Sequence, residues 1–296
     1  MEIKEFGQVI ARELKDLLGD GYSIEYRDVV KNNGIVYHAV VIRKDGENVA
    51  PTIYIDKYYE EYTKGSLIMG IVKDIADIYR QCIPSCSFDL DFYFDFSKVS
   101  QKLFFKVLSY RKNREKLKNV PIKRIMDLAL VPMCIYKNRM LGEGTIMIQD
   151  SHLETWEITR EELWENVALS APKVAPPKIS SLMDFLSRVT GENTSVDELC
   201  GIYVVTNTSE NLGAGTIFYP GLLKGIADDH ECDLYIIPSS IHECIVIPDD
   251  GYSMDTSFLR NIIREVNSST VADVEILSDN LYRYDRDEDR LSIVKG

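Results

Sequence analysis

Residues 230–248, HECDLYIIPSSIHECIVIP, decide the fold of the C-terminal half of the chain. Two apolar runs, LYIIP and CIVIP, lie on either side of a short polar stretch that begins with proline and two serines. Apolar runs of this length around a turn predict two antiparallel strands joined as a hairpin. We expect the turn to occupy residues 238–241 and Ile237 to pair with His242, so that Cys232 faces Ile247.

The same stretch repeats the triplet His-Glu-Cys, so that it holds two imidazoles and two thiols. Histidine and cysteine are the usual ligands of zinc. In the expected hairpin, however, five residues of strand separate His230 and Cys232 from His242 and Cys244, which is about 17 Å at ~3.3 Å per residue. The sequence therefore predicts no metal and no cofactor. It favours Cys244 as a small buried residue and places His230 near the C-terminus of a helix.

Strand pairs alternate with single helices along the rest of the chain. An amphipathic helix begins the sequence, and YSIEYRDVV and IVYHAVVIRKDG predict two strands, with His38 in the second as a structural residue. A further strand is expected at GTIFY (215–219), after the glycines of NLGAG. This order predicts an α+β fold of two α/β-mixed halves, with mostly antiparallel sheets and flanking helices.

The 296 residues exceed the length of a typical single domain. We expect an N-terminal α-β-β-β-α unit over residues 1–87 and a middle region, 88–170, packed with it. A proline-rich linker is expected at 171–181, followed by a C-terminal α+β domain over 182–296.

The charge is distributed unevenly. The chain has a net charge of −13, which argues against a generic nucleic-acid-binding protein, but residues 102–139 carry 11 basic and 2 acidic side chains. Within SYRKNREKLKNVPIKR (109–124), a site for an anion such as nucleic acid would use five residues: Arg111, Lys112, Arg114, Lys116 and Lys118. A solvated segment that balances the acidic remainder is the favoured interpretation, because Tyr110 is the only aromatic residue among these charges.

The N-terminus is amphipathic, without a basic start followed by an apolar block, and no run approaches the roughly 20 apolar residues that cross a bilayer. We therefore expect a cytoplasmic protein without membrane contact. The six scattered cysteines are expected to be reduced thiols.

Residues near the 238–243 turn are the candidates for a binding or catalytic site. In an enzyme, His242 would be the base, Ser239 or Ser240 an orienting group, and Glu243, Asp249 or Asp250 a carboxylate partner or metal ligand. Convergence of His242 with Ser151 and His152 would favour this hypothesis. The chain lacks the G-x-S-x-G, G-x-x-x-x-G-K-[ST] and H-E-x-x-H motifs, so no catalytic residue is assigned.

Several segments in order resemble a bacterial family of about this length, common in anaerobic gut bacteria, whose members are known only as a domain of unknown function. These segments are SHLETWEITREELWENV, YVVTN, FYPGLL, LYIIPSSIHE, PDDG, REVN and LSDNLYRYDRDEDRL. The resemblance implies an intracellular accessory protein and includes PSSIHE (238–243) in the family pattern. It implies no activity, cofactor or catalytic residue.

The leading hypothesis is a non-enzymatic cytoplasmic binding or regulatory protein whose partner is another protein, because the catalytic motifs are weak and the charge asymmetry suits association. Contact with nucleic acid through residues 102–139 is possible but not favoured. One alternative is a small-molecule or phosphoester-processing enzyme with a His/Ser/carboxylate site near 238–250. Another is an acidic mimic of nucleic acid that inhibits a DNA-binding protein, which rests on the net charge of −10 over residues 227–296. The oligomeric state is open.

Overall fold

The structure is a computed structural model, which describes residues 1–47, 49–82, 93–138, 142–191, 201–249, 251 and 255–295. Asp250, one of the candidate carboxylates, lies outside the described residues, as do Cys86 and Cys200. Contacts divide the chain into two compact units, each described here by itself. Unit 1 comprises residues 1–91 and 137–143, and unit 2 comprises residues 92–136 and 144–296.

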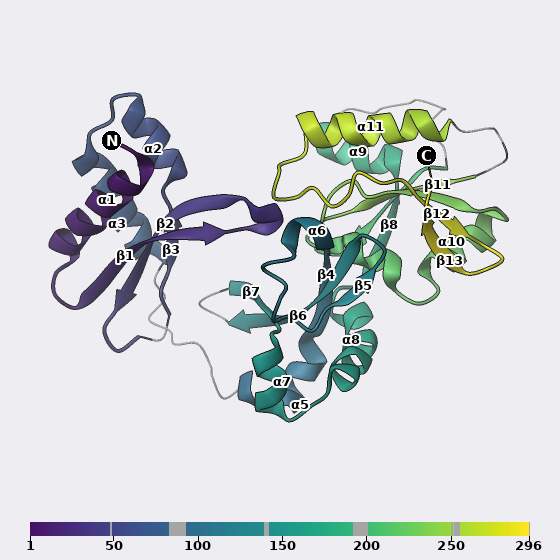
Figure 1. The fold of residues 1–296 in the computed structure, drawn as a ribbon, viewed down its shortest axis with the longest axis horizontal. Helices are drawn as coiled ribbons and strands as arrows, with labels where there is room; N and C mark the ends of the chain where they lie inside the picture. Colours follow the sequence, from purple (N-terminus) through teal and green to yellow (C-terminus); the bar gives the residue numbers. More distant parts are fainter. Residues whose placement is uncertain are drawn as a thin grey trace. The chain divides into compact units, whose positions relative to one another are not determined.

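Unit 1 is a three-stranded antiparallel sheet with helices, in the strand order β1-β2-β3. Its elements in chain order are α1 (Ile3–Leu18), β1 (Tyr22–Val30), the short 3-10 turn η1 (Asn32–Gly34), β2 (Val36–Lys44), β3 (Thr52–Tyr54), α2 (Asp56–Thr63) and α3 (Ile68–Cys82) (Figure 1). The predicted first helix and the two long strands are confirmed.

The core of unit 1 follows from helical spacing. Phe6, Ile10 and Leu14 recur every four residues, so they lie on one face of α1 and are fully buried. Gly7 allows this helix to approach the sheet, because a Cβ at that position would lie 2.2 Å from the ring of Tyr26. His38 joins β2 to the start of α2: its Nδ1 lies 2.8 Å from one carboxylate oxygen of Asp56, and its backbone N–H donates to the other at 3.0 Å.

Unit 2 holds two sheets. In the four-stranded sheet, β6 (Leu128–Asn138) pairs antiparallel with β4 (Leu103–Ser109) and β5 (Lys123–Ile125), and also pairs with β7 (Gly142–Met147). The helical segments around this sheet are α5 (Phe96–Val99), η2 (Ser100–Lys102), α6 (Tyr110–Asn113), α7 (Asp150–Trp156) and α8 (Arg160–Val174).

The six-stranded sheet of unit 2 has the order β13-β12-β10-β11-β9-β8 and is antiparallel throughout. Its strands are β8 (Pro177–Ser181), β9 (Tyr203–Asn207), β10 (Leu234–Ile237), β11 (Cys244–Pro248), β12 (Tyr282–Asp285) and β13 (Arg290–Ile293). The accompanying helices are α9 (Leu182–Thr190), η4 (Gly213–Phe218), α10 (Leu222–His230) and α11 (Thr256–Ser269).

The two faces of this sheet have different coverings. Tyr235 and Ile247 pack with Leu259 and Ile263 of α11, which runs across the sheet (Figure 1). On β11 the alternate residues Cys244 and Val246 are fully buried. The Cys244 thiol lies 3.8 Å from the Ala214 carbonyl in η4. The prediction of Cys244 as a small buried residue is confirmed.

The register of the central hairpin differs from the predicted one. Ile237 pairs with Ile245 rather than with His242, so the connection comprises six residues, 238–243, instead of four. The physical reason is local: the Ser240 N–H donates to the Glu243 carbonyl at 3.2 Å, and the hydroxyl of Ser240 donates to the Glu243 carboxylate at 2.8 Å. These bonds keep His242 and Glu243 in the loop.

Two other predictions, the strand at 215–219 and the linker at 171–181, are wrong. GTIFY (215–219) is not a strand, because residues 213–218 form the 3-10 helix η4, in which the Thr216 hydroxyl donates to the Gly213 carbonyl at 2.8 Å. The expected linker, 171–181, forms the last part of α8 and strand β8. A strand can begin at Pro177 because β8 is an edge strand, where a missing N–H is tolerated.

The middle region, 88–170, was expected to pack with the N-terminal unit. By its contacts, most of it (92–136 and 144–170) belongs instead to unit 2. Asp127, in the β5–β6 turn, shows one reason. Its carboxylate accepts hydrogen bonds from Ser278 at 2.7 Å, Asn280 at 3.0 Å and Tyr282 at 2.8 Å, which ties the middle region to the C-terminal part of the chain.

Candidate functional site

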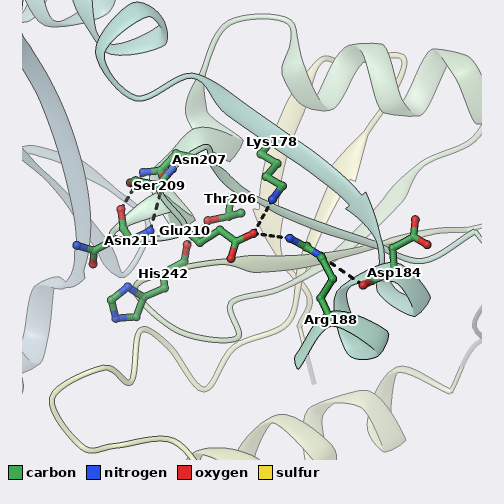
Figure 2. Close-up of polar contacts among 9 residues, drawn as sticks. All are labelled: Lys178, Asp184, Arg188, Thr206, Asn207, Ser209, Glu210, Asn211 and His242. Carbon is green, nitrogen blue, oxygen red and sulfur yellow. Dashed lines mark hydrogen bonds and ion pairs between the residues drawn. The ribbon is translucent and has the colours of Figure 1, made fainter. Parts of the chain in front are cut away.

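Two polar loops meet at one end of the six-stranded sheet, and we call them the paired loops: residues 207–213 and 238–243. Strands β9 and β11 are antiparallel, with Val205 opposite Cys244. The end of β9 therefore adjoins the start of β11, and the segments that follow and precede them lie together. Figure 2 shows the first loop beside His242 of the second.

Asn207 organises the first loop from within. Its side chain is 2% exposed, and its Oδ1 accepts hydrogen bonds from the backbone N–H and the hydroxyl of Ser209 at 3.1 and 2.8 Å. Its Nδ2 donates to the carbonyl of Asn211 at 2.8 Å. A buried amide that closes a turn in this way replaces the strand ladder after β9 and fixes the loop backbone.

Two residues of this loop adopt left-handed backbone conformations, with φ of 52° at Glu210 and 54° at Leu212. Non-glycine residues adopt this region at a cost, so surrounding contacts must hold it in place. For Glu210 these contacts are the amino group of Lys178 at 2.6 Å and the guanidinium of Arg188 at 2.8 Å (Figure 2). Hydrogen bonds from Lys178 and Arg188 hold the pKa of the Glu210 carboxyl below its usual range.

His242 contacts the first loop through its ring and the end of β9 through its backbone. The ring Nδ1 accepts the backbone N–H of Leu212 at 3.1 Å, and the carbonyl accepts the hydroxyl of Thr206 at 2.7 Å. A neutral ring that accepts at Nδ1 carries its proton at Nε2, which lies 3.5 Å from a carboxylate oxygen of Glu275. The imidazole thus supports the backbone of the neighbouring loop.

The other predicted residues of the 238–243 loop are also held within it. Ser240 is 6% exposed; its hydroxyl donates to Glu243 and accepts the backbone N–H of His242 at 2.9 Å. Ser239 is half-buried. The Ser240 hydroxyl is therefore directed toward a carboxylate and a backbone amide, and the His242 ring is directed toward the other loop.

The structure separates the remaining candidates from this site. Asp249 follows β11 whereas His242 precedes it, so the five-residue strand lies between them, about 17 Å at ~3.3 Å per residue. Asp249 lies 3.5 Å from the guanidinium of Arg283, which also pairs with Asp233 at 2.7 Å. Of the three carboxylates that the enzyme hypothesis offered, Asp249 is therefore too far from His242 to be its partner.

Ser151 and His152 belong to α7. The His152 Nδ1 accepts the Gln149 N–H at 3.0 Å and lies 2.8 Å from the Tyr93 hydroxyl, while the ring packs edge-to-face on Tyr93. Burial lowers the pKa of His152. Ser151 is exposed, and its carbonyl accepts the Thr155 hydroxyl. No hydrogen bond or ring contact between described residues joins this pair to His242.

The first His-Glu-Cys lies elsewhere. His230 is the last residue of α10, as predicted, and its Nε2 lies 2.7 Å from the hydroxyl of Tyr203. Within the described ranges, no group of three or more histidine, cysteine or acidic side chains is arranged to hold a metal ion. Cys134 and Cys244 are buried free thiols, and burial raises the pKa of Cys134 to about 12.

The five predicted anion-binding residues lie on α6 and the turn that follows it. Arg111, Lys112, Arg114 and Lys118 are exposed, and Lys116 is half-buried. Lys118 pairs with Glu115 of the same turn, which holds the pKa of the Glu115 carboxyl below its usual range.

Sequence reasoning did not single out Asn207, Glu210, Lys178 or Arg188. A signal for Asn207 is present in the sequence, because Asn-Thr-Ser after the apolar run YVV is typical of an Asx turn. Lys178 and Arg188 lie 32 and 22 residues from Glu210 in the sequence. No local pattern brings them together, and only the pairing of β8 with β9 does so.

Together, the fold and the paired loops define a class: an α+β protein with mostly antiparallel sheets and a polar loop site at the end of the larger sheet. The model of a family of unknown function, DUF5688, matches residues 3–286, and the chain belongs to this family. No curated protein and no solved structure shows significant similarity to the chain. Among the described residues, every helix is too short or too polar to span a lipid bilayer.

Proposed function

We propose that this protein is a non-enzymatic binding protein that recognises another protein through the paired loops. The observation that carries the proposal is the 3.1 Å hydrogen bond from the Leu212 N–H to Nδ1 of His242. A ring nitrogen that accepts a backbone amide cannot also take a proton from a substrate, so the one histidine of the loops acts as a support.

The shape of the first loop suits recognition. Ser209, Glu210 and Asn211 are exposed, while the side chain of Asn207 and the ring of His242 hold the backbone beneath them. A loop that is already ordered loses little conformational entropy when a partner binds, so more of the contact energy contributes to affinity. Polar groups in fixed positions also give selectivity.

The proposal includes a cytoplasmic location, because free thiols such as those of Cys134 and Cys244 are typical of reducing compartments. The enzyme hypothesis and the acidic-mimic hypothesis have no comparable support. Acidic side chains near the C-terminus are partly neutralised by internal arginines, as in the pairs Asp233–Arg283 and Asp228–Arg286.

Site-specific photocrosslinking tests the proposal. Asn211 is replaced by p-benzoylphenylalanine, and the protein is irradiated in extract of the source organism. We expect an adduct with one defined protein. The same group at Lys4, an exposed residue of α1, serves as the control and is expected to give no such adduct.

Two variants then test the role of the fixed loop. His242→Ala removes the acceptor of the Leu212 N–H and should reduce the adduct at position 211 several-fold, because the loop loses its support. His242→Asn offers a side-chain oxygen near the position of Nδ1 and should retain most of the adduct at position 211. Equal adducts from positions 211 and 4, no adduct at all, or an undiminished adduct in folded His242→Ala would refute the proposal.

A further inference from the structure

Helix α6 and the turn that follows it present a concentrated positive charge on an acidic chain. The exposed cations are Arg111, Lys112, Arg114 and Lys118, and they lie within eight consecutive residues. The surrounding segment, 102–139, has 11 basic and 2 acidic residues in a chain of net charge −13. We call these four side chains the basic turn.

Buried residues hold the basic turn in place. Asn113, Leu117 and Val120 are 2%, 4% and 4% exposed, so they alternate with the exposed cations. The Asn113 side chain donates to the Ser109 carbonyl at 2.9 Å, and the Leu117 N–H donates to the Asn113 carbonyl at 3.1 Å. The backbone that carries the cations is therefore anchored to the core of unit 2.

If the cations of the basic turn served to neutralise particular acidic side chains of the chain, they would form ion pairs with them. Lys118 pairs with Glu115, which belongs to the turn itself. Arg111 and Lys112 form no ion pair with any residue that the structure describes. Their charge is directed to solvent, where an external anion can reach it.

The aromatic rings beside the turn indicate how such an anion would be contacted. The guanidinium of Arg124 covers the ring of Tyr110, with 4.4 Å from its carbon to the ring centroid. The amino group of Lys123 lies 5.0 Å from the ring centroid of Trp164, which is 6% exposed. Because a cation of this segment lies over each ring, the covered face of the ring is not available to stack on a nucleobase.

We propose that the basic turn binds the phosphodiester backbone of nucleic acid without reading its sequence. Phosphates at the spacing of a duplex carry condensed counterions, and their release favours binding to a short cluster of cations. An acidic protein surface has a lower density of negative charge and fewer condensed counterions, so it gains less from their release. Screening over about 8 Å at physiological salt limits repulsion of the nucleic acid by acids elsewhere on the chain.

This inference is independent of the paired loops, and fluorescence anisotropy tests it. Labelled DNA and RNA duplexes of about 20 base pairs and a polyglutamate peptide are titrated with the full chain at roughly 50 to 200 mM salt. We expect both duplexes to bind, with a slope of log K against log salt of about −3 for three to four phosphate contacts. Unequal affinity for DNA and RNA would identify the source of the phosphodiester.

A matched pair of triple variants locates the surface. The first triple variant combines Arg111→Gln, Lys112→Gln and Arg114→Gln. It should weaken duplex binding at least about tenfold at 100 mM salt and reduce the slope of log K against log salt. Lys4→Gln, Lys64→Gln and Lys73→Gln remove the same charge from exposed positions of unit 1 and should leave binding unchanged. Circular dichroism verifies that both variants fold.

Three results would overturn the inference. The first is failure of the unmodified protein to bind either duplex at the lowest salt. The second is an equal loss of binding in both triple variants, which would indicate a general effect of net charge. The third is binding of polyglutamate as tightly as of the duplexes, which would indicate an acidic protein as the partner.

Discussion

At the scale of single residues, Gly213 determines whether the paired loops can meet. A Cβ at this position would lie 2.3 Å from the Thr206 hydroxyl, 2.5 Å from the Asn207 nitrogen and 2.8 Å from the His242 carbonyl. Two of these atoms belong to the backbone and cannot rotate away. The absence of a side chain is therefore a steric requirement for the contact between η4, β9 and the 238–243 loop.

Gly213→Ala is accordingly expected to destabilise the protein by about 2 kcal/mol, because the added methyl group forces the backbone of the loops apart. Urea denaturation followed by circular dichroism measures the change. Gly225→Ala is the matched control: it lies in α10 with nothing within 4 Å of its Cβ, and it should stabilise the helix by about 0.5–1 kcal/mol. Equal stability of the two variants would contradict the assigned role of Gly213.

At the scale of elements, local side chains cap the N-terminus of α8. Thr159 and Glu162 form a capping box, in which the Glu162 N–H donates to the Thr159 hydroxyl at 3.1 Å and the Thr159 N–H donates to the Glu162 carboxylate at 2.8 Å. The hydrogen bonds from the backbone and hydroxyl of Thr159 lower the pKa of the Glu162 carboxyl.

This lowered pKa predicts a pH-dependent contribution of Glu162 to stability. Because the folded state favours the ionised carboxylate, the contribution is fully present above the usual glutamate pKa of about 4.3 and is lost as the pH falls through the lower folded value. Melting temperatures measured between about pH 3 and pH 7 should show that Glu162→Gln is less stable than the unmodified protein at neutral pH, and that the difference narrows in acid.

Glu165→Gln provides the comparison on the same helix, since Glu165 is an exposed carboxylate outside the capping box. Its melting temperature should differ little from that of the unmodified protein across the range. The melting temperatures of Glu162→Gln and the unmodified protein could instead differ by a constant amount down to the lowest pH. That result would show that the charge of the carboxylate does not stabilise the cap.

At the scale of the whole molecule, the chain has separate hydrophobic cores in its two units. Ile75 is fully buried in the core of unit 1, where helices pack on the three-stranded sheet. Leu234 is fully buried on β10 in unit 2. Each unit can therefore lose its own core packing when it unfolds.

We expect calorimetry to show two unfolding transitions. Ile75→Ala should lower the melting temperature of the unit 1 transition, and Leu234→Ala that of the unit 2 transition. Each substitution should cost its unit about 2–5 kcal/mol of unfolding free energy, because a large buried side chain is replaced by a cavity. Each variant is the control for the other. A single transition that both substitutions lower would show that the units unfold together.

Local patterns were enough to predict much of the fold. The first helix and the strands of the first hairpin depend on residues close in sequence, such as Phe6, Ile10 and Leu14 at helical spacing. The α+β class with mostly antiparallel sheets follows from the order of these elements, and the structure confirms it.

The tertiary structure alone decided the site. The sequence by itself determined that a turn beginning at Pro238 joins two apolar strands, and that Cys244 is buried. The register of that hairpin depends on bonds inside its loop, and the position of His242 depends on the Leu212 amide, 30 residues away in sequence. Such contacts form only when β9 and β11 pair, because no periodicity along the chain specifies which distant groups meet at a sheet's end.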